Sequence, residues 1–138
     1  MTLRLNPYLN FRDQAREALE FYRSVFGGEL VLMTLGEGGM ADDPADAELI
    51  MHGQLTTTAG FTLMAGDTAA TMDDPVIGTA VNISVSGDDE ETIRGYWERL
   101  SEGAEVVEPL ATAPWGDLFG LLNDRFGIAW LFNSGDEG

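Results

Sequence analysis

The sequence predicts an α+β fold made of two similar modules, each with the order strand, helix, strand, strand, strand. One observation is a repeat: residues 5–32 show the same order of apolar and polar residues as residues 81–109. A second is that two later apolar segments of each module recur 67 positions apart, the first pair beginning at His52 and Phe119. A repeat of about 70 residues is too long for a solenoid unit and too short for two independent domains.

We therefore expect a single domain over residues 1–138, with modules near 3–67 and 78–134. A four-stranded unit with one helix covers only one face of its sheet, so the other face must be buried elsewhere or stay in water. Two such units together would form a curved mixed sheet whose uncovered faces enclose a shared cleft. A cleft of this kind suits a small ligand.

The first module begins with a predicted strand, because Leu5, Leu9 and Phe11 alternate with polar residues. Pro7 places this strand at an edge or makes it a strand start, since proline cannot donate a ladder hydrogen bond. Asp13 is the predicted N-cap of the helix that follows. The apolar face of this helix is predicted at Ala15, Leu19, Tyr22 and Phe26, and Gly27 and Gly28 end the helix. The next two strands are predicted at Glu29–Leu35 and Ile50–Thr57.

The second module repeats this order. Val81, Ile83 and Val85 alternate with Ala80, Asn82 and Ser84 and predict a strand, and the acidic run Asp88–Glu91 predicts a helix start. The apolar positions of that helix fall 74 places after those of the first helix, and Gly103 ends it. In each module, tight turns containing glycine are predicted between the last two strands.

Composition excludes several classes of function. The 138-residue chain has no cysteine, so a disulfide framework, a thiolate metal site and a cysteine nucleophile are all excluded. Its net charge of -17 comes from 24 acidic residues and seven arginines, with no lysine, and disfavours nucleic acid and anionic membranes as partners. Such charge attracts small cations, although it also serves solubility. No apolar run approaches a membrane span in length, and we expect a cytoplasmic protein.

Several segments in a fixed order resemble one known family. NPYLNF, AREALEFYRSVFGGEL, IMHGQL and PWGDLFGLLNDRFGIAW resemble the vicinal oxygen chelate superfamily, and within it the PhnB-like branch. The superfamily includes glyoxalases, extradiol dioxygenases and bleomycin-resistance proteins, and the resemblance implies its fold and a homodimer. The methyltransferase label sometimes attached to this branch lacks support here, because no glycine-rich nucleotide-binding turn follows a strand.

The resemblance also implies where a metal would bind in metal-dependent members, namely on the first and last strands of each module. The corresponding positions here are predicted to be Asn6, Met64, Ala80 and Leu131. A thioether, a methyl and an isobutyl group are poor ligands for zinc, nickel or hard cations, and an amide alone is weak. We therefore predict no metal site and no cofactor.

His52 is the one histidine of the chain, and it shares a strand parity with Gln54. If Leu55 packs under the helix, both side chains face the predicted cleft. His52 is then a candidate general base or ligand contact. The competing interpretation is a structural histidine, hydrogen-bonded inside the protein or beside a dimer interface.

Further candidate contacts are uncharged polar residues and one tryptophan. The polar residues lie opposite the apolar positions of the two first strands, where they either hydrogen-bond a neutral or zwitterionic ligand or form the wet side of a sheet. The indole of Trp115 can stack on a planar or cationic ligand, or pin its loop to the core. The full set comprises Asn6, Tyr8, Asn10, Gln54, Asn82, Ser84 and Trp115.

Three functions remain open on the sequence. The preferred hypothesis is a protein that binds a small organic molecule without a catalytic metal, by sequestration or sensing. The alternative is a metal-dependent lyase or isomerase of glyoxalase type, or a dioxygenase, with His52 as base. The third is a non-catalytic interaction module.

Overall fold

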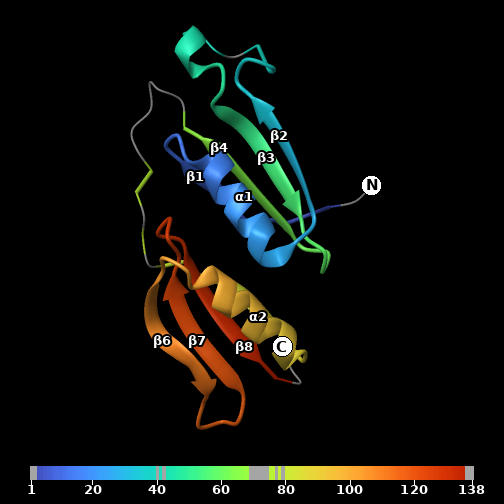
Figure 1. Ribbon diagram of the computed structural model, residues 1–138, viewed down its shortest axis with the longest axis vertical. Helices are drawn as coiled ribbons and strands as arrows, with labels where there is room; N and C mark the ends of the chain where they lie inside the picture. Colours follow the sequence, from blue (N-terminus) through green and yellow to red (C-terminus); the bar gives the residue numbers. More distant parts are fainter. Residues whose placement is uncertain are drawn as a thin grey trace. The chain divides into compact units, whose positions relative to one another are not determined.

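The computed structural model describes residues 3–39, 41, 43–68, 75–76, 78 and 80–135. The chain divides into two compact units, Met1–Val76 and Ile77–Gly138, and each is a βαβββ module (Figure 1). This order confirms the predicted α+β fold with two repeated modules. No helix in the described part of the chain combines the length and hydropathy needed to cross a membrane.

The first module is a four-stranded mixed sheet with the strand order β1-β4-β3-β2. Strand β1 runs parallel to β4, and the other neighbours are antiparallel. The elements are β1 Tyr8–Phe11, α1 Ala15–Phe26, β2 Glu29–Thr34, the short 3-10 helix η1 Pro44–Asp46, β3 Ile50–Thr56 and β4 Thr62–Asp67.

The second module has the same topology, with the strand order β5-β8-β7-β6. Strand β5 runs parallel to β8, and β6 and β7 continue the sheet in antiparallel fashion. The elements are β5 Ile83–Gly87, α2 Glu90–Leu100, β6 Glu105–Thr112, β7 Leu118–Asn123 and β8 Ala129–Ser134.

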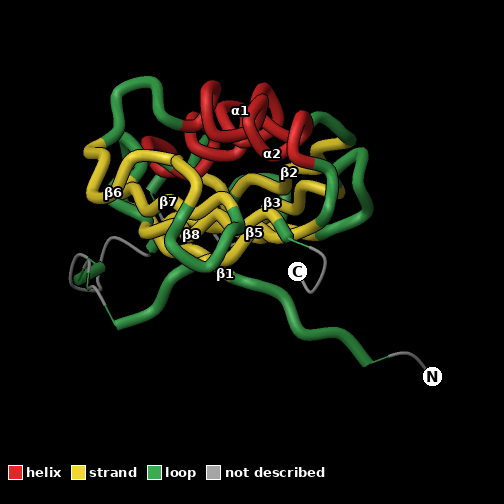
Figure 2. Tube along the Cα trace, turned by 90° about the horizontal axis from the view of Figure 1, so that it is seen from below, coloured by secondary structure: helices red, strands yellow, loops and turns green. Residues whose placement is uncertain are grey.

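The helix of each module lies on one face of that module's sheet (Figure 2). In the first module, the predicted helix positions are buried and Leu19 approaches β3 closely at Gly53, where a β-carbon would meet its Cδ1. In the second, Trp97 packs edge-on against Phe132, with 5.3 Å between ring centroids, and Trp130 is buried. Trp97 and Trp130 therefore both contribute to the packing of this module.

Both predicted first strands begin later than expected. Strand β1 starts at Tyr8 and leaves Leu5 97% exposed, while β5 starts at Ile83 and leaves Val81 79% exposed. Pro7 has no N–H to donate, and only its carbonyl joins the sheet, by accepting from Met64 N. Alternation alone therefore predicted strand residues that have no partner strand beside them.

The predicted N-cap of α1 is also wrong. Gln14 occupies that position without a side-chain cap, and Asp13 adopts a positive φ of 64°. The cap comes instead from Asp67 at the end of β4, whose Oδ1 accepts from Ala15 N at 2.9 Å. By contrast, the acidic start predicted for α2 is confirmed, because Asp89 caps it by accepting from Thr92 N.

The predicted turns between the last two strands are confirmed in both modules. Thr57 N donates to Phe61 O in the first module, and Asp124 N donates to Ile128 O in the second, both at 2.8 Å. Each turn contains a glycine with a positive φ, which is 100° for Gly60 and 87° for Gly127. The two turns are equivalent positions of the repeat.

The long loop that follows β2 is held at its base. Leu35 N donates to Leu49 O, and Thr34 and Glu37 bond each other reciprocally, backbone N–H to side-chain oxygen, at 3.0 and 3.1 Å. Hydrogen bonds from the backbone N–H and the side chain of Thr34 lower the pKa of the Glu37 carboxyl. The sequence leaves two roles open for this loop, Gly36–Glu48, namely a flap over the ligand or plain surface, and Met40 and Asp42 lie outside the described residues.

Candidate functional site

The face of the first sheet that α1 leaves uncovered carries most of the predicted site. Leu55 is fully buried on the helix side, so His52 and Gln54 project from the opposite side. Across the four strands, one row of this face places Tyr8 opposite Met64, Met64 opposite Gln54, and Gln54 opposite Val31. The next row places Asn10 opposite Gly66 and His52 opposite Met33.

Tyr8 and His52 are brought together on this face. Their rings stack with 5.7 Å between centroids and 25° between planes, and Tyr8 Oη donates to Met51 O at 3.4 Å. Gly66 makes this possible, because a β-carbon there would lie 2.6 Å from Tyr8 Oη and 2.9 Å from Met51 O. The missing side chain of Gly66 leaves the recess in which the phenol lies.

His52 is half-buried and keeps its hydrogen-bonding capacity. Within the described residues, its ring contacts Tyr8 but its nitrogens have no hydrogen-bond partner. A neutral imidazole offers one donor and one acceptor. A structural histidine bonded inside the protein would need a hydrogen bond that the described part of the chain does not supply, whereas a histidine beside a dimer interface stays a prediction.

The other polar candidates of the first module are lightly engaged. Gln54 Nε2 donates to Thr56 Oγ1 at 3.5 Å, and Asn6 Nδ2 lies 3.8 Å from Met64 Sδ. Asn10 is exposed at the row of His52. These weak contacts leave the amides able to turn toward a ligand.

Desolvation by partial burial raises the pKa of Tyr8, and the negative charge of Asp67 raises it further. The phenol therefore stays protonated at neutral pH and acts as a hydrogen-bond donor and a ring surface. It does not supply a base. Asp67, which sequence reasoning did not single out, accepts from Ala15 N with one oxygen and from Ile50 N with the other.

In the second module the predicted contacts are more dispersed. Ser84 is exposed and lies opposite Leu131 in the row that continues to Leu121 and Glu108. Asn82 is exposed just before β5 and belongs to no strand. Neither has a hydrogen-bond partner within the described residues.

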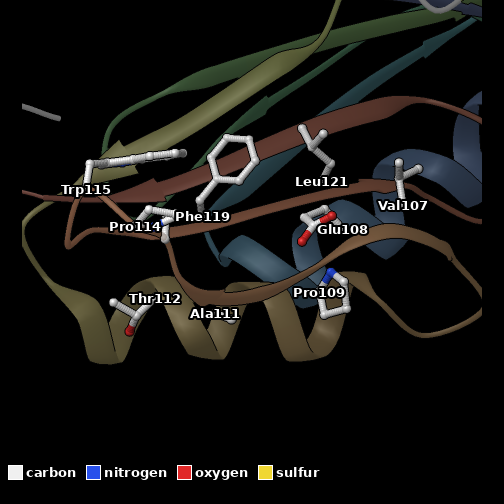
Figure 3. A pocket seen from close by; sticks show the side chains of 10 residues that line it. Val107, Glu108, Pro109, Ala111, Thr112, Pro114, Trp115, Phe119 and Leu121 are labelled. Carbon is white, nitrogen blue, oxygen red and sulfur yellow. The ribbon is translucent and has the colours of Figure 1, made fainter.

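Trp115 is 62% exposed in the loop between β6 and β7, so it does not pin that loop to the core. Its ring meets Phe119 edge-on, at 5.6 Å and 69°. Both rings line a groove of about 350 Å³ (Figure 3). Sequence reasoning missed Phe119 and Glu108 in this groove, although the strand parity that places Leu122 in the core also places Phe119 and Leu121 on the opposite face.

One of the four metal positions predicted from sequence, Ala80, needs a correction. Met64 pairs with Tyr8, and its counterpart Leu131 pairs with Ser84, so the first strands are related by 76 positions. Asn82, rather than Ala80, is therefore the counterpart of Asn6. The helices keep a spacing of 74 because the stretch from Tyr8 to Leu19 is two residues longer than the equivalent stretch from Ser84 to Ile93.

The corrected positions still do not fit a divalent cation. They supply two amides, one thioether and one isobutyl group, and Asn6 already lies against Met64 Sδ. Among the described residues, no cluster of three or more histidine, aspartate or glutamate side chains could hold a metal ion.

Two repeated βαβββ modules of this topology find a match among known families. The sequence pattern of the Glyoxalase/Bleomycin resistance protein/Dioxygenase superfamily matches residues 4–132. The chain belongs to this superfamily. That membership confirms the resemblance seen in the sequence, and it leaves open which of the activities in the superfamily's name applies here.

Similar proteins come from several bacteria. An uncharacterized superfamily relative from Mycobacterium bovis is 32% identical over 133 residues, which are 91% of this chain and 79% of that protein. A crystal structure from Pseudomonas aeruginosa is 33% identical with a TM-score of 0.82, covering 98% of this chain and 99% of that one. A PhnB protein from Bacillus cereus is 25% identical with a TM-score of 0.76, covering 96% and 100%.

Proposed function

We propose that this superfamily member binds a small neutral or zwitterionic organic molecule on the uncovered face of the first module, without a catalytic metal. Binding would serve sequestration or sensing of that molecule. The observation that carries the proposal is His52: it is half-buried, stacked on Tyr8, and free of hydrogen-bond partners within the described residues. A polar ring in this state offers its donor and acceptor to a ligand.

The character of this face supports a ligand without net charge. The two rows that contain Tyr8 and His52 hold amides, thioethers, rings and Val31, and no carboxylate, lysine or arginine. A charged ligand would lose hydration there without gaining an ion pair. Tyr8 offers an apolar ring, while His52 and Gln54 offer directional hydrogen bonds, a combination typical of small-molecule sites.

The metal-dependent lyase, isomerase or dioxygenase has less support. Its chemistry needs an ion to polarise a substrate oxygen or to bind dioxygen, and the donor set at the expected positions does not fit one. Elemental analysis of protein purified without chelator should give less than one divalent metal per chain. About one metal per chain, lost on chelation together with binding or turnover, would overturn this part of the proposal.

A homodimer and enclosure of the ligand by both modules stay predictions. Within the described residues, β1, β2 and β5 are edge strands that pairing with a second chain would protect. Light scattering at micromolar concentration should give twice the mass of the chain. A species that remains monomeric would remove the dimer from the proposal and leave the site on the first module intact.

The decisive experiment compares His52→Ala with the wild type. Neutral and zwitterionic compounds that raise the melting temperature of the wild type are titrated by calorimetry into both proteins and into the control Thr58→Ala, which alters an exposed turn residue. We expect His52→Ala to weaken binding about tenfold, through loss of a hydrogen bond and of ring contact. Its melting temperature should match that of the control.

The structural interpretation of His52 predicts the opposite outcome. Loss of a structural histidine would lower the free energy of unfolding by about 1–3 kcal/mol through its unpaired partners, and affinity would not change. That result would remove His52 from the site and end the proposal for this face.

A further inference from the structure

The groove between β6 and β7 has a chemistry that the proposed function does not use. It has a volume of about 350 Å³, within the range of small-molecule sites. Figure 3 shows Phe119, Leu121 and Val107 projecting to the same side of this hairpin, with the Trp115 ring beside Phe119. The wall is therefore aromatic at one end and aliphatic at the other.

One charged side chain lies in this apolar wall. Glu108 pairs with Leu121 across the two strands and lies between Leu121 and Pro109 in Figure 3. It is exposed, and within the described residues its carboxylate has no hydrogen-bond or ion-pair partner. None of the residues that line the groove is basic. The charge of Glu108 is thus available to a ligand.

From these features we infer that the groove binds a flat aromatic cation, whose ring lies against Trp115 and whose positive charge is balanced by Glu108. An exposed indole attracts a cation through its ring quadrupole, and a flat ring fills the space between Trp115 and the aliphatic wall. The net charge of -17 raises the local concentration of such a ligand. This inference is independent of the proposed site on the first module.

The strand that forms the wall argues against a peptide or a second chain as the occupant. A partner strand needs a regular row of free N–H and C=O groups. Strand β6 has register shifts between Val106 and Glu108 and between Glu108 and Ala111, and Pro109 has no N–H to donate. Bulges, proline and charge are the features by which edge strands avoid pairing.

The test uses three probes that share a tricyclic size. N-methylacridinium is a permanent cation, acridine is uncharged at mildly alkaline pH, and 9-anthracenecarboxylate is an anion. Their binding to the full-length protein is followed by the fluorescence anisotropy of each probe. We expect the cation to bind about tenfold more tightly than acridine, and the anion not to bind measurably.

Two pairs of variants locate the site. Trp115→Leu keeps an apolar side chain but removes the ring, and should weaken N-methylacridinium about tenfold, whereas Trp115→Phe should retain most of the affinity. Glu108→Gln should weaken the cation about threefold and leave acridine unchanged. Glu105→Gln is the matched control, because it removes the same charge from the same strand at a carboxylate that accepts from Asn123 outside the groove.

Several outcomes would overturn the inference. Equal affinity for cation and acridine, or equal effects of Glu108→Gln and Glu105→Gln, would show that Glu108 has no specific role. Unchanged probe binding by Trp115→Leu would place the probe elsewhere on the protein. A change of oligomeric state in Trp115→Leu, with probe affinity unaltered, would assign the groove to a contact between two chains.

Discussion

In the first module, the N-terminus of α1 is capped by Asp67, 52 residues further along the chain, whereas α2 is capped by Asp89 directly before it. The turns between the last two strands show the opposite pattern, because here the second module has the aspartate. Asp124 accepts from Phe126 N, Ile128 N and the buried indole of Trp130, while its counterpart in the first module is a threonine that bonds one backbone N–H. Each module therefore has one aspartate that accepts several hydrogen bonds, at the end of the last strand in the first module and in the turn before the last strand in the second.

The uncovered faces differ in the same way. The first carries His52, Tyr8 and amides, and the second carries a groove lined by Trp115, Phe119 and the carboxylate of Glu108. Topology fixes which positions face away from each helix, but the side chains there are free to diverge. A repeated fold can thus offer two surfaces of different chemistry within one chain.

The largest effect should come from the turn of the second module. Asp124→Ala leaves three donors unpaired, two of them on the backbone, and should lower the free energy of unfolding by about 3–5 kcal/mol. Thr57→Ala, the matched change in the first module, should cost about 1 kcal/mol. Urea denaturation measures both, and Asp124→Asn provides an intermediate if the alanine variant does not fold. Equal losses at the two turns would end the comparison.

Helix capping should show the opposite ranking. Asp67→Ala removes the acceptor of both Ala15 N and Ile50 N, and should cost about 2–3 kcal/mol because it unties α1 from β3 and β4. Asp89→Ala removes an exposed local cap and should cost about 1 kcal/mol. Hydrogen exchange at the α1 N-terminus should rise only in the first variant. Greater loss in Asp89→Ala would contradict the long-range role of Asp67.

A smaller effect is expected where Gly66 and Asn133 occupy equivalent positions 67 apart. Gly66→Ala places a β-carbon 2.6 Å from Tyr8 Oη and 2.9 Å from Met51 O, so the ring must leave its stack on His52 and the backbone must shift, at a cost of about 1–2 kcal/mol. Asn133→Ala adds no atoms and should change stability by less than about 0.5 kcal/mol. The ring-current shifts of the His52 proton resonances measure the stack. Unchanged shifts in Gly66→Ala would show that Tyr8 has another place to lie.

The smallest effect concerns the phenol of Tyr8. Its pKa is raised by desolvation and by Asp67, so the unfolded chain loses this proton at a lower pH than the folded chain does. The contribution to stability is present below about pH 10 and is lost as the pH rises above that value through the folded pKa. In Tyr8→Phe, the free energy of unfolding should therefore decrease slightly less steeply as the pH rises in the alkaline range. An unchanged alkaline slope would mean that the folded environment does not shift this group.

Periodicity in the sequence was sufficient for the fold. Apolar alternation and helical spacing predicted both helices and the glycine turns, because these patterns record which side of an element is buried. It also predicted that His52 and Gln54 face away from the helix. Strand starts were less well determined, since Leu5 and Val81 continue the alternation beyond the point where a neighbouring strand can pair with them.

Only the tertiary structure determined the contacts between residues that lie far apart in the sequence. No local rule joins Asp67 to the start of α1, Tyr8 to the imidazole of His52, or Glu108 to a groove with Trp115. Strand register sets these neighbours, and register depends on the whole sheet because one shifted residue moves a side chain to the other face. The sequence alone therefore determined that His52 and Gln54 face away from the helix of their module, whereas the folded sheet determined which side chains meet.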